Sequence, residues 1–196
     1  MMKTAIAAAA ALLGLAASPA PAQEDARDLA RISNYLNATE TLQGRFVQVD
    51  HDAVVSEGAF YMRRPGRMRF QYDPPNPALV IADGVWVGVV DQRDGHADRY
   101  PLRETPLHLL LRDNVDLRAE GAVTDIDRSG GQLAVTAVDP ANPGLGQITM
   151  IFDNNPLALR QWVVVDAEGR TTTVALRDLR ANVAIPADRF VIRDPR

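Results

Sequence analysis

The chain has 196 residues, no cysteine and a formal net charge of −4, from 25 acidic and 21 basic residues. This length suits one domain of ordinary size, and the acidic balance argues against a nucleic-acid binder, which needs a basic surface. The lack of cysteine excludes disulfides, thiolate metal sites, cysteine nucleophiles and the acylated N-terminal cysteine of a bacterial lipoprotein.

The N-terminus has the pattern of an export signal. Lys3, the only lysine of the chain, precedes an apolar run from Thr4 to Ala17, and Ala20-Pro21-Ala22 has the small residues that a signal peptidase recognises. The run is shorter than the roughly 20 residues that span a bilayer. We therefore predict that residues 1–22 are a cleaved signal peptide and that residues 23–196 form one soluble, monomeric periplasmic domain.

The first element of the mature chain is predicted to be an amphipathic helix. Between Glu24 and Leu42, apolar residues recur at multiples of three and four positions. We expect Gly44 to end this helix. The apolar face of the helix carries Leu29, Ile32, Leu36 and Leu42.

After this helix the apolar period changes to two, which is typical of strands. Arg67–Asp73 places Met68, Phe70 and Tyr72 on one face, and Gln147–Phe152 places Ile148, Met150 and Phe152 on one face. Turn signals such as Asp83-Gly84 separate further strand candidates. These are Ala78–Ala82, Val85–Val90, Ala122–Asp127, Gln132–Val138, Ala158–Val165 and Thr171–Leu179. Short strands joined by hairpins predict a mainly β protein with an antiparallel sheet, open or rolled into a barrel.

A short leucine-rich helix is predicted to interrupt the strands at Thr105–Arg112. Thr105 suits an N-cap, and Pro106 suits the first helical position. The four leucines that follow cannot all face one side. They must be covered on several sides, or their exposed side must await a ligand.

Catalytic chemistry has little support in the sequence, and no metal or cofactor site is predicted. His51 and His96 lie in turn-like segments, and His108 has no second ligand at helical spacing. Asp50-His51-Asp52 could orient an imidazole, but no serine in a nucleophile-elbow context accompanies it. A triad assembled only in three dimensions remains an alternative.

Arginines are concentrated between Arg63 and Arg69. Such a cluster could bind an anion, but we expect Arg67 and Arg69 to lie on the solvated face of an alternating strand. Either Arg63 or Arg64 must then share the face of the apolar residues, where its guanidinium needs hydrogen-bond acceptors.

Several segments, in one order along nearly the whole mature chain, resemble the LolA family of periplasmic outer-membrane lipoprotein carriers. The N-terminal helix and the Thr105-Pro106-Leu107 helix belong to this set. Its other members are Phe46-Val47-Gln48, Glu57-Gly58, a strand ending at Arg64-Pro65, Phe70-Gln71-Tyr72, Pro74, Ala78–Gly84, Val85-Trp86-Val87, Ile148–Phe152, a strand bearing Trp162, and Phe190-Val191-Ile192.

The resemblance implies an unclosed antiparallel barrel with helices across its mouth as a lid. It implies that the protein accepts lipoproteins from an inner-membrane lipoprotein-releasing ABC transporter, shields their acyl chains and delivers them to the outer membrane, in many bacteria through a lipoprotein receptor. The arginine that holds the family's lid closed corresponds to Arg64. Met68 and Phe70 correspond to large apolar lining residues, although Met68 stands where an aromatic is common, and His108 is a second departure within the lid helix.

The expected acyl-binding residues combine this resemblance with the apolar patterns. They are Leu29, Ile32, Leu36, Phe46, Met68, Phe70, Tyr72, Trp86, Leu107, Leu110, Leu111, Ile148, Met150 and Phe152.

Three alternatives remain open from the sequence. The chain could be a lipid-binding or lipid-sensing protein of the same superfamily, or a hydrolase acting on acylated substrates. The leucine-rich helix could also pack in a closed core that binds nothing. The receptor member of the superfamily is disfavoured, because it needs a lipidated cysteine.

Overall fold

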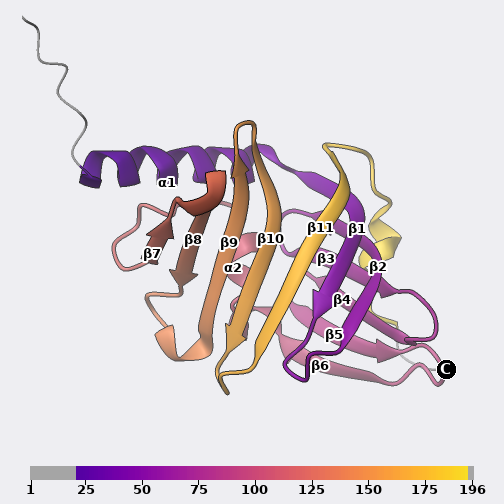
Figure 1. Cartoon of the computed structure of the whole chain (residues 1–196). Helices are drawn as coiled ribbons and strands as arrows, with labels where there is room; N and C mark the ends of the chain where they lie inside the picture. The colour runs from indigo at the N-terminus through magenta and orange to yellow at the C-terminus, as the bar shows by residue number, and fades with distance from the viewer. Residues whose placement is uncertain (1–20, 194–196) are drawn as a thin grey trace, which may run out of the picture.

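One antiparallel sheet of eleven strands organises the part of the chain that the computed structural model describes, residues 21–193 (Figure 1). The strand order is β6-β5-β4-β3-β2-β1-β11-β10-β9-β8-β7, so β6 and β7 are edges that do not pair with each other. The predicted unclosed barrel is therefore confirmed. The strands are β1 Thr41–Val49, β2 Val55–Arg63, β3 Arg67–Tyr72, β4 Ala78–Asp83, β5 Trp86–Asp91, β6 Ala97–Pro101, β7 Val123–Asp127, β8 Gln132–Val138, β9 Gly146–Asn154, β10 Leu157–Asp166 and β11 Thr171–Ala181.

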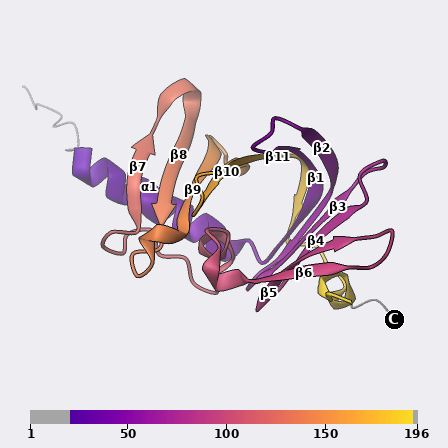
Figure 2. The same ribbon diagram turned by 90° about the horizontal axis from the view of Figure 1, so that it is seen from below.

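The sheet consists of two hairpin meanders, β1–β6 and β7–β11, joined where β1 pairs with β11. It is strongly curved, as Figure 2 shows from below. The link from edge β6 to edge β7 contains the short helix α2, His108–Leu111, after the 3-10 turn η1, Leu102–Glu104. The other 3-10 turns are η2 Ser129–Gly131, η3 Pro143–Leu145 and η4 Ala187–Phe190.

The N-terminal helix α1, Pro21–Ala38, lies across the ends of β7 to β10 (Figure 1). It begins within the last two residues of the predicted signal peptide. The rest of that signal, residues 1–20, lies outside the described residues. None of the described helices is both long enough and apolar enough to cross a bilayer.

The predicted end of the N-terminal helix, at Leu42, is wrong. α1 ends at Ala38, where Thr39 donates hydrogen bonds from its backbone N–H and its hydroxyl to the Tyr35 carbonyl oxygen. Leu42 and Phe46 are both buried in β1. Leu42 and Phe46 are four residues apart, which is close to one turn of a helix and equals two repeats of a strand. Their spacing therefore fits both structures.

Gly44 lies inside β1 rather than after a helix. The register of β1 against β11 shifts between Gln43 and Arg45, which marks a bulge at Gly44. A Cβ atom there would lie 2.6 Å from the Arg177 carbonyl oxygen. The glycine is therefore explained by a close backbone approach within the sheet.

Other boundaries also differ from the sequence prediction. β6 was not predicted, because Asp98, Arg99 and Tyr100 are all exposed and show no alternating burial. The leucine-rich helix is shorter than Thr105–Arg112, because only His108–Leu111 is α-helical. Its Leu109, Leu110 and Leu111 are nevertheless buried, as expected if it is covered on several sides.

A close backbone contact at Gly58 yields a stability prediction. A Cβ atom there would lie 2.0 Å from the Gln71 carbonyl oxygen of β3 and 2.8 Å from the Phe46 ring, whereas one at Gly144 would have nothing within 4 Å. We expect Gly58→Ala to destabilise the protein by about 2 kcal/mol or more, which lowers the melting temperature by roughly 4–8 °C. Thermal unfolding of Gly58→Ala and the control Gly144→Ala checks this; equal melting temperatures would contradict it.

Candidate functional site

The predicted apolar lining is brought together on the concave face of the sheet. Ile32 and Leu36 of α1 and Leu110 and Leu111 of α2 belong to one buried cluster with side chains of the strands. Leu29 and Leu107 pack against its edge. The strand residues predicted to share it are Phe46, Met68, Phe70, Tyr72, Ile148, Met150 and Phe152, each at most 9% exposed.

Aromatic rings form the centre of this cluster. Phe46 contacts Phe70 edge-on at 4.9 Å between ring centroids, and Tyr72 at 5.0 Å. The Tyr72 hydroxyl donates to Gln48 Oε1 at 2.8 Å, and burial raises the pKa of Tyr72 to about 12. The one polar group of this aromatic set is therefore neutral and satisfied, which keeps the surface apolar.

Trp86 lies apart from the other predicted lining residues. Its neighbour Val87 faces the core, so the pleat of β5 turns Trp86 to the opposite side, where it is 42% exposed. It lines a separate groove of about 750 Å³ beside the end of α2, together with Pro65, Gly66 and Leu111. The run Val85-Trp86-Val87 is apolar throughout, so its sequence does not reveal the inward face.

Several core residues are absent from the predicted lining. Phe60 and Met62 of β2 are 0% and 1% exposed, and Trp162 of β10 is 2% exposed. Phe60 and Trp162 contact each other at 5.8 Å between ring centroids. The alternation of Gly58, Phe60 and Met62 was the available signal, but the aromatic Tyr61 obscures it.

Arg64 joins the sheet to both helical segments that cover the concave face. Its Nη1 donates to the carbonyl oxygen of Leu36 in the last turn of α1. Its Nε donates to the Arg112 carbonyl oxygen at 3.2 Å, and its Nη2 donates to Asn37 Oδ1 at 3.2 Å and to the Asp113 carbonyl oxygen at 3.5 Å. The expectation that Arg64 needs acceptors is met by these backbone and amide oxygens.

The position of Arg64 is electrostatically favourable as well. α1 has no basic residue in its last turn, and Arg64 supplies a cation to the negative end of the helix dipole. Burial lowers the pKa of Arg64, with Asp113 opposing the shift, but an arginine remains charged throughout the ordinary pH range.

Side chains of α1 complete the contact with the segment after α2. Asn37 Nδ2 donates to the Val115 carbonyl oxygen at 3.0 Å, and the Val115 N–H donates to Asn37 Oδ1 at 2.9 Å. The Leu117 N–H donates to the buried Ser33 hydroxyl at 3.1 Å. We call α1 together with residues 107–117 the lid, because these two segments are bonded to each other and cover the apolar cluster.

Ion pairs and hydrogen bonds also hold α1 to the strands beneath it. Arg128, between β7 and β8, pairs with Asp28 at 2.9 Å and with Asp25 at 2.6 Å. Arg31 donates to the Asn154 carbonyl oxygen at 3.0 Å, and the Tyr35 hydroxyl accepts the Leu159 N–H at 3.1 Å. The lid is thus fixed along its edges by polar contacts and beneath by apolar ones.

His108 has local partners that the sequence did not indicate. Its Nδ1 lies 2.7 Å from the Thr105 carbonyl oxygen, and its Nε2 lies 3.2 Å from Arg112 Nη2 and 3.7 Å from Asp139 Oδ2. The Asn142 side chain, with smaller contributions from His108 and Arg112, holds the pKa of Asp139 below its ordinary value. The cluster ties the lid to the β8–β9 connection.

The other two histidines are exposed in turns, as predicted. His51 lies beside Asp52 at 3.3 Å in the β1–β2 hairpin, and His96 lies beside Asp98 at the same distance. Asp50, His51 and Asp52 could direct one ligand atom each toward a common point. Exposed acidic groups of this kind are common without an ion, so the concave face and its lid are the candidate site.

Comparisons with known proteins identify sequence relatives and structures with a related fold. The family model described as outer membrane lipoprotein carrier protein LolA matches residues 37–193. An outer-membrane lipoprotein carrier protein of Halorhodospira halophila is 33% identical and covers 87% of this chain and 83% of its own length. One of Pseudomonas aeruginosa is 28% identical and covers 94% of this chain and 92% of its own length. A solved structure, an uncharacterized conserved protein from Thermus thermophilus, is 8% identical, with a TM-score of 0.48, covering 84% of this chain and 91% of that one.

The contacts of Arg64 predict a looser lid in Arg64→Leu. Losing charge-assisted bonds worth roughly 1–3 kcal/mol should raise the population of the open lid at least about fivefold. Uptake of an environment-sensitive apolar dye by the cargo-free protein measures this. The neighbouring Arg63→Leu is the control, because Arg63 makes none of these lid contacts. Equal dye uptake in the two variants would show that Arg64 does not hold the lid.

Proposed function

The chain belongs to the LolA family of outer membrane lipoprotein carrier proteins, and we propose that it shields lipoprotein acyl chains on the concave face of its sheet. The cargo is released from the inner membrane and delivered to the outer membrane through the periplasm. The observation that supports this role most strongly is an apolar interior covered by a lid that is fastened by polar contacts around Arg64.

The free energy of cargo transfer sets the requirement for such an interior. Each CH₂ group of an acyl chain left in water costs about 0.8 kcal/mol, so a lipoprotein with several chains is insoluble without cover. The concave face offers phenylalanine, methionine and leucine side chains, which adapt to a flexible apolar ligand. In the closed structure these side chains are packed against the lid, so cargo must displace it.

Displacement can be nearly neutral in free energy. Fully burying a leucine or isoleucine side chain contributes roughly 1.5–3 kcal/mol, and acyl chains would restore the apolar contacts that Ile32, Leu36, Leu110 and Leu111 lose. The remaining cost of opening is the polar contacts of Arg64 and Asn37, a few kcal/mol in total. The closed and loaded states are then close enough in free energy for cargo to be both accepted and released.

We assign Arg64 the role of latch. Its guanidinium stabilises the closed lid and gains nothing from bound cargo, so it favours release. In this proposal the protein catalyses no reaction on its cargo. Residues 1–22 direct export, an inner-membrane lipoprotein-releasing ABC transporter supplies the lipoprotein, and an acceptor in the outer membrane, such as a lipoprotein receptor, receives it.

The cargo can be identified directly. The protein is purified from periplasm by a tag, and bound molecules are identified by mass spectrometry. We expect intact acylated lipoproteins, because the apolar interior recognises acyl chains. A tagged exported protein without an apolar interior serves as the control. Recovery of free phospholipid alone would contradict lipoprotein carriage and favour a general lipid carrier.

Arg64→Leu should retain cargo more strongly and deliver it more slowly. The substitution removes stabilisation of the closed, empty state, so the loaded state is favoured by about fivefold or more. Release of a labelled lipoprotein to outer-membrane vesicles measures the effect against Arg63→Leu. Unchanged retention and unchanged delivery in Arg64→Leu would exclude the latch role.

A further inference from the structure

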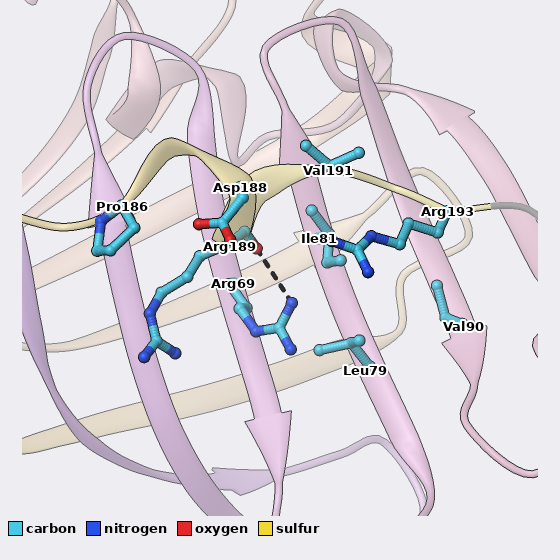
Figure 3. Close-up of a pocket in the computed structure, with 9 residues that line it drawn as sticks. All are labelled: Arg69, Leu79, Ile81, Val90, Pro186, Asp188, Arg189, Val191 and Arg193. Atoms are coloured by element: carbon cyan, nitrogen blue, oxygen red, sulfur yellow. Dashed lines mark hydrogen bonds between the residues drawn. The ribbon is translucent and has the colours of Figure 1, made fainter.

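A second cavity lies on the convex face of the sheet, away from the apolar interior. It has a volume of about 460 Å³ and lies between β3–β5 and the C-terminal segment, η4 followed by residues 191–193 (Figure 3). Leu79 and Ile81 of β4 and Val90 of β5 form its apolar floor, and Val191 lies on the covering side. Successive residues of a strand face opposite sides of the sheet, so Arg69, Leu79 and Ile81 point away from the concave face. This cavity is therefore separate from the proposed acyl-binding surface.

Arg69 lies at the centre of this cavity. Met68 and Phe70 face the core, so Arg69 faces outward, where the C-terminal segment covers it instead of solvent. Its Nη1 donates to the Arg189 carbonyl oxygen at 3.0 Å, and its Nη2 lies 3.3 Å from Gln71 Oε1. Its Nε is buried and has no hydrogen-bond partner among the described residues. A buried N–H donor without an acceptor is costly.

The cavity also concentrates positive charge in an acidic protein. Among the described residues that line it, Arg69, Arg189 and Arg193 are accompanied by a single carboxylate, Asp188. Within residues 21–193, none of the three arginines forms an ion pair. Arg189 instead lies over the Tyr61 ring, 4.5 Å from its centroid. Burial and the two neighbouring arginines lower the pKa of Arg69, which reflects desolvation and repulsion that a bound anion would relieve.

We propose that this cavity binds a phosphoryl group. A phosphate ester carries roughly −1.5 to −2 charges at neutral pH, which matches the excess of arginine over aspartate in the lining. Guanidinium groups bind its oxygens in a planar, bidentate manner, and Arg69 Nε supplies a donor that has no partner within residues 21–193. The apolar floor accommodates the carbon substituent of an ester. The group can come from a soluble phosphoester or from an anionic phospholipid head group.

Two probes distinguish these sources. Glycerol 3-phosphate is titrated into the full-length protein by calorimetry, and flotation measures binding to phosphatidylcholine vesicles with or without phosphatidylglycerol. We expect at least one probe to bind, and Arg69→Gln to weaken that binding about tenfold or more. Arg193→Gln should weaken it as well, and because Arg193 is exposed, this second variant is expected to fold normally.

Arg160→Gln is the matched control. It removes the same charge from β10, where Arg160 pairs with Asp153 at 2.6 Å, far from the cavity in sequence. Binding that is lost in Arg69→Gln and Arg193→Gln but kept in Arg160→Gln supports the site, and the probe that binds identifies the source. Failure of both probes to bind, or an equal loss in Arg160→Gln, would overturn the proposal. Neither outcome bears on lipoprotein carriage.

Discussion

The guanidinium of Arg64 is the contact on which the closed structure depends. It bonds the end of α1 to the backbone after α2, two segments about 75 residues apart in sequence that meet over the concave face. Without Arg64, the carbonyl oxygens of Leu36 and Arg112 would lose a charged donor close to an apolar interior. Because this contact is polar rather than apolar, it gives the lid one specific closed position. It also allows the lid to leave that position for the open, loaded state.

The two ends of α1 are held by different kinds of interaction. The ion pairs of Arg128 with Asp25 and Asp28 are partly exposed, and such pairs usually contribute about 0–1 kcal/mol each. Ile32 and Leu36 are almost fully buried and contribute more. The helix is therefore retained chiefly by apolar contacts that acyl chains can replace, while charged contacts determine where it rests. This division of roles is what a reversible carrier requires.

Much of this arrangement was accessible from the sequence, for identifiable reasons. Strict alternation in Arg67–Tyr72 correctly placed Met68, Phe70 and Tyr72 on the concave face, and the same alternation required a buried acceptor for Arg64 or Arg63. Trp86 was misplaced because Val85 and Val87 on either side of it are both apolar, so the period of two does not show which of the three faces inward. The outward orientation of Arg69 was predicted correctly, but its burial beneath the C-terminal segment was not. The C-terminal segment that covers it is distant in sequence, and no local pattern reports such a contact.

Hydrogen–deuterium exchange on cargo binding tests the central claim most directly. The protein is compared with and without a triacylated lipopeptide, and exchange is followed in α1 and in residues 107–117, with the β1–β11 pair as an internal reference. Displacement of the lid predicts faster exchange at the backbone amides of Val115 and Leu117, whose hydrogen bonds to Asn37 Oδ1 and the Ser33 hydroxyl are lost, and unchanged protection in the reference strands. Bound lipopeptide with undiminished protection of the lid would contradict the account.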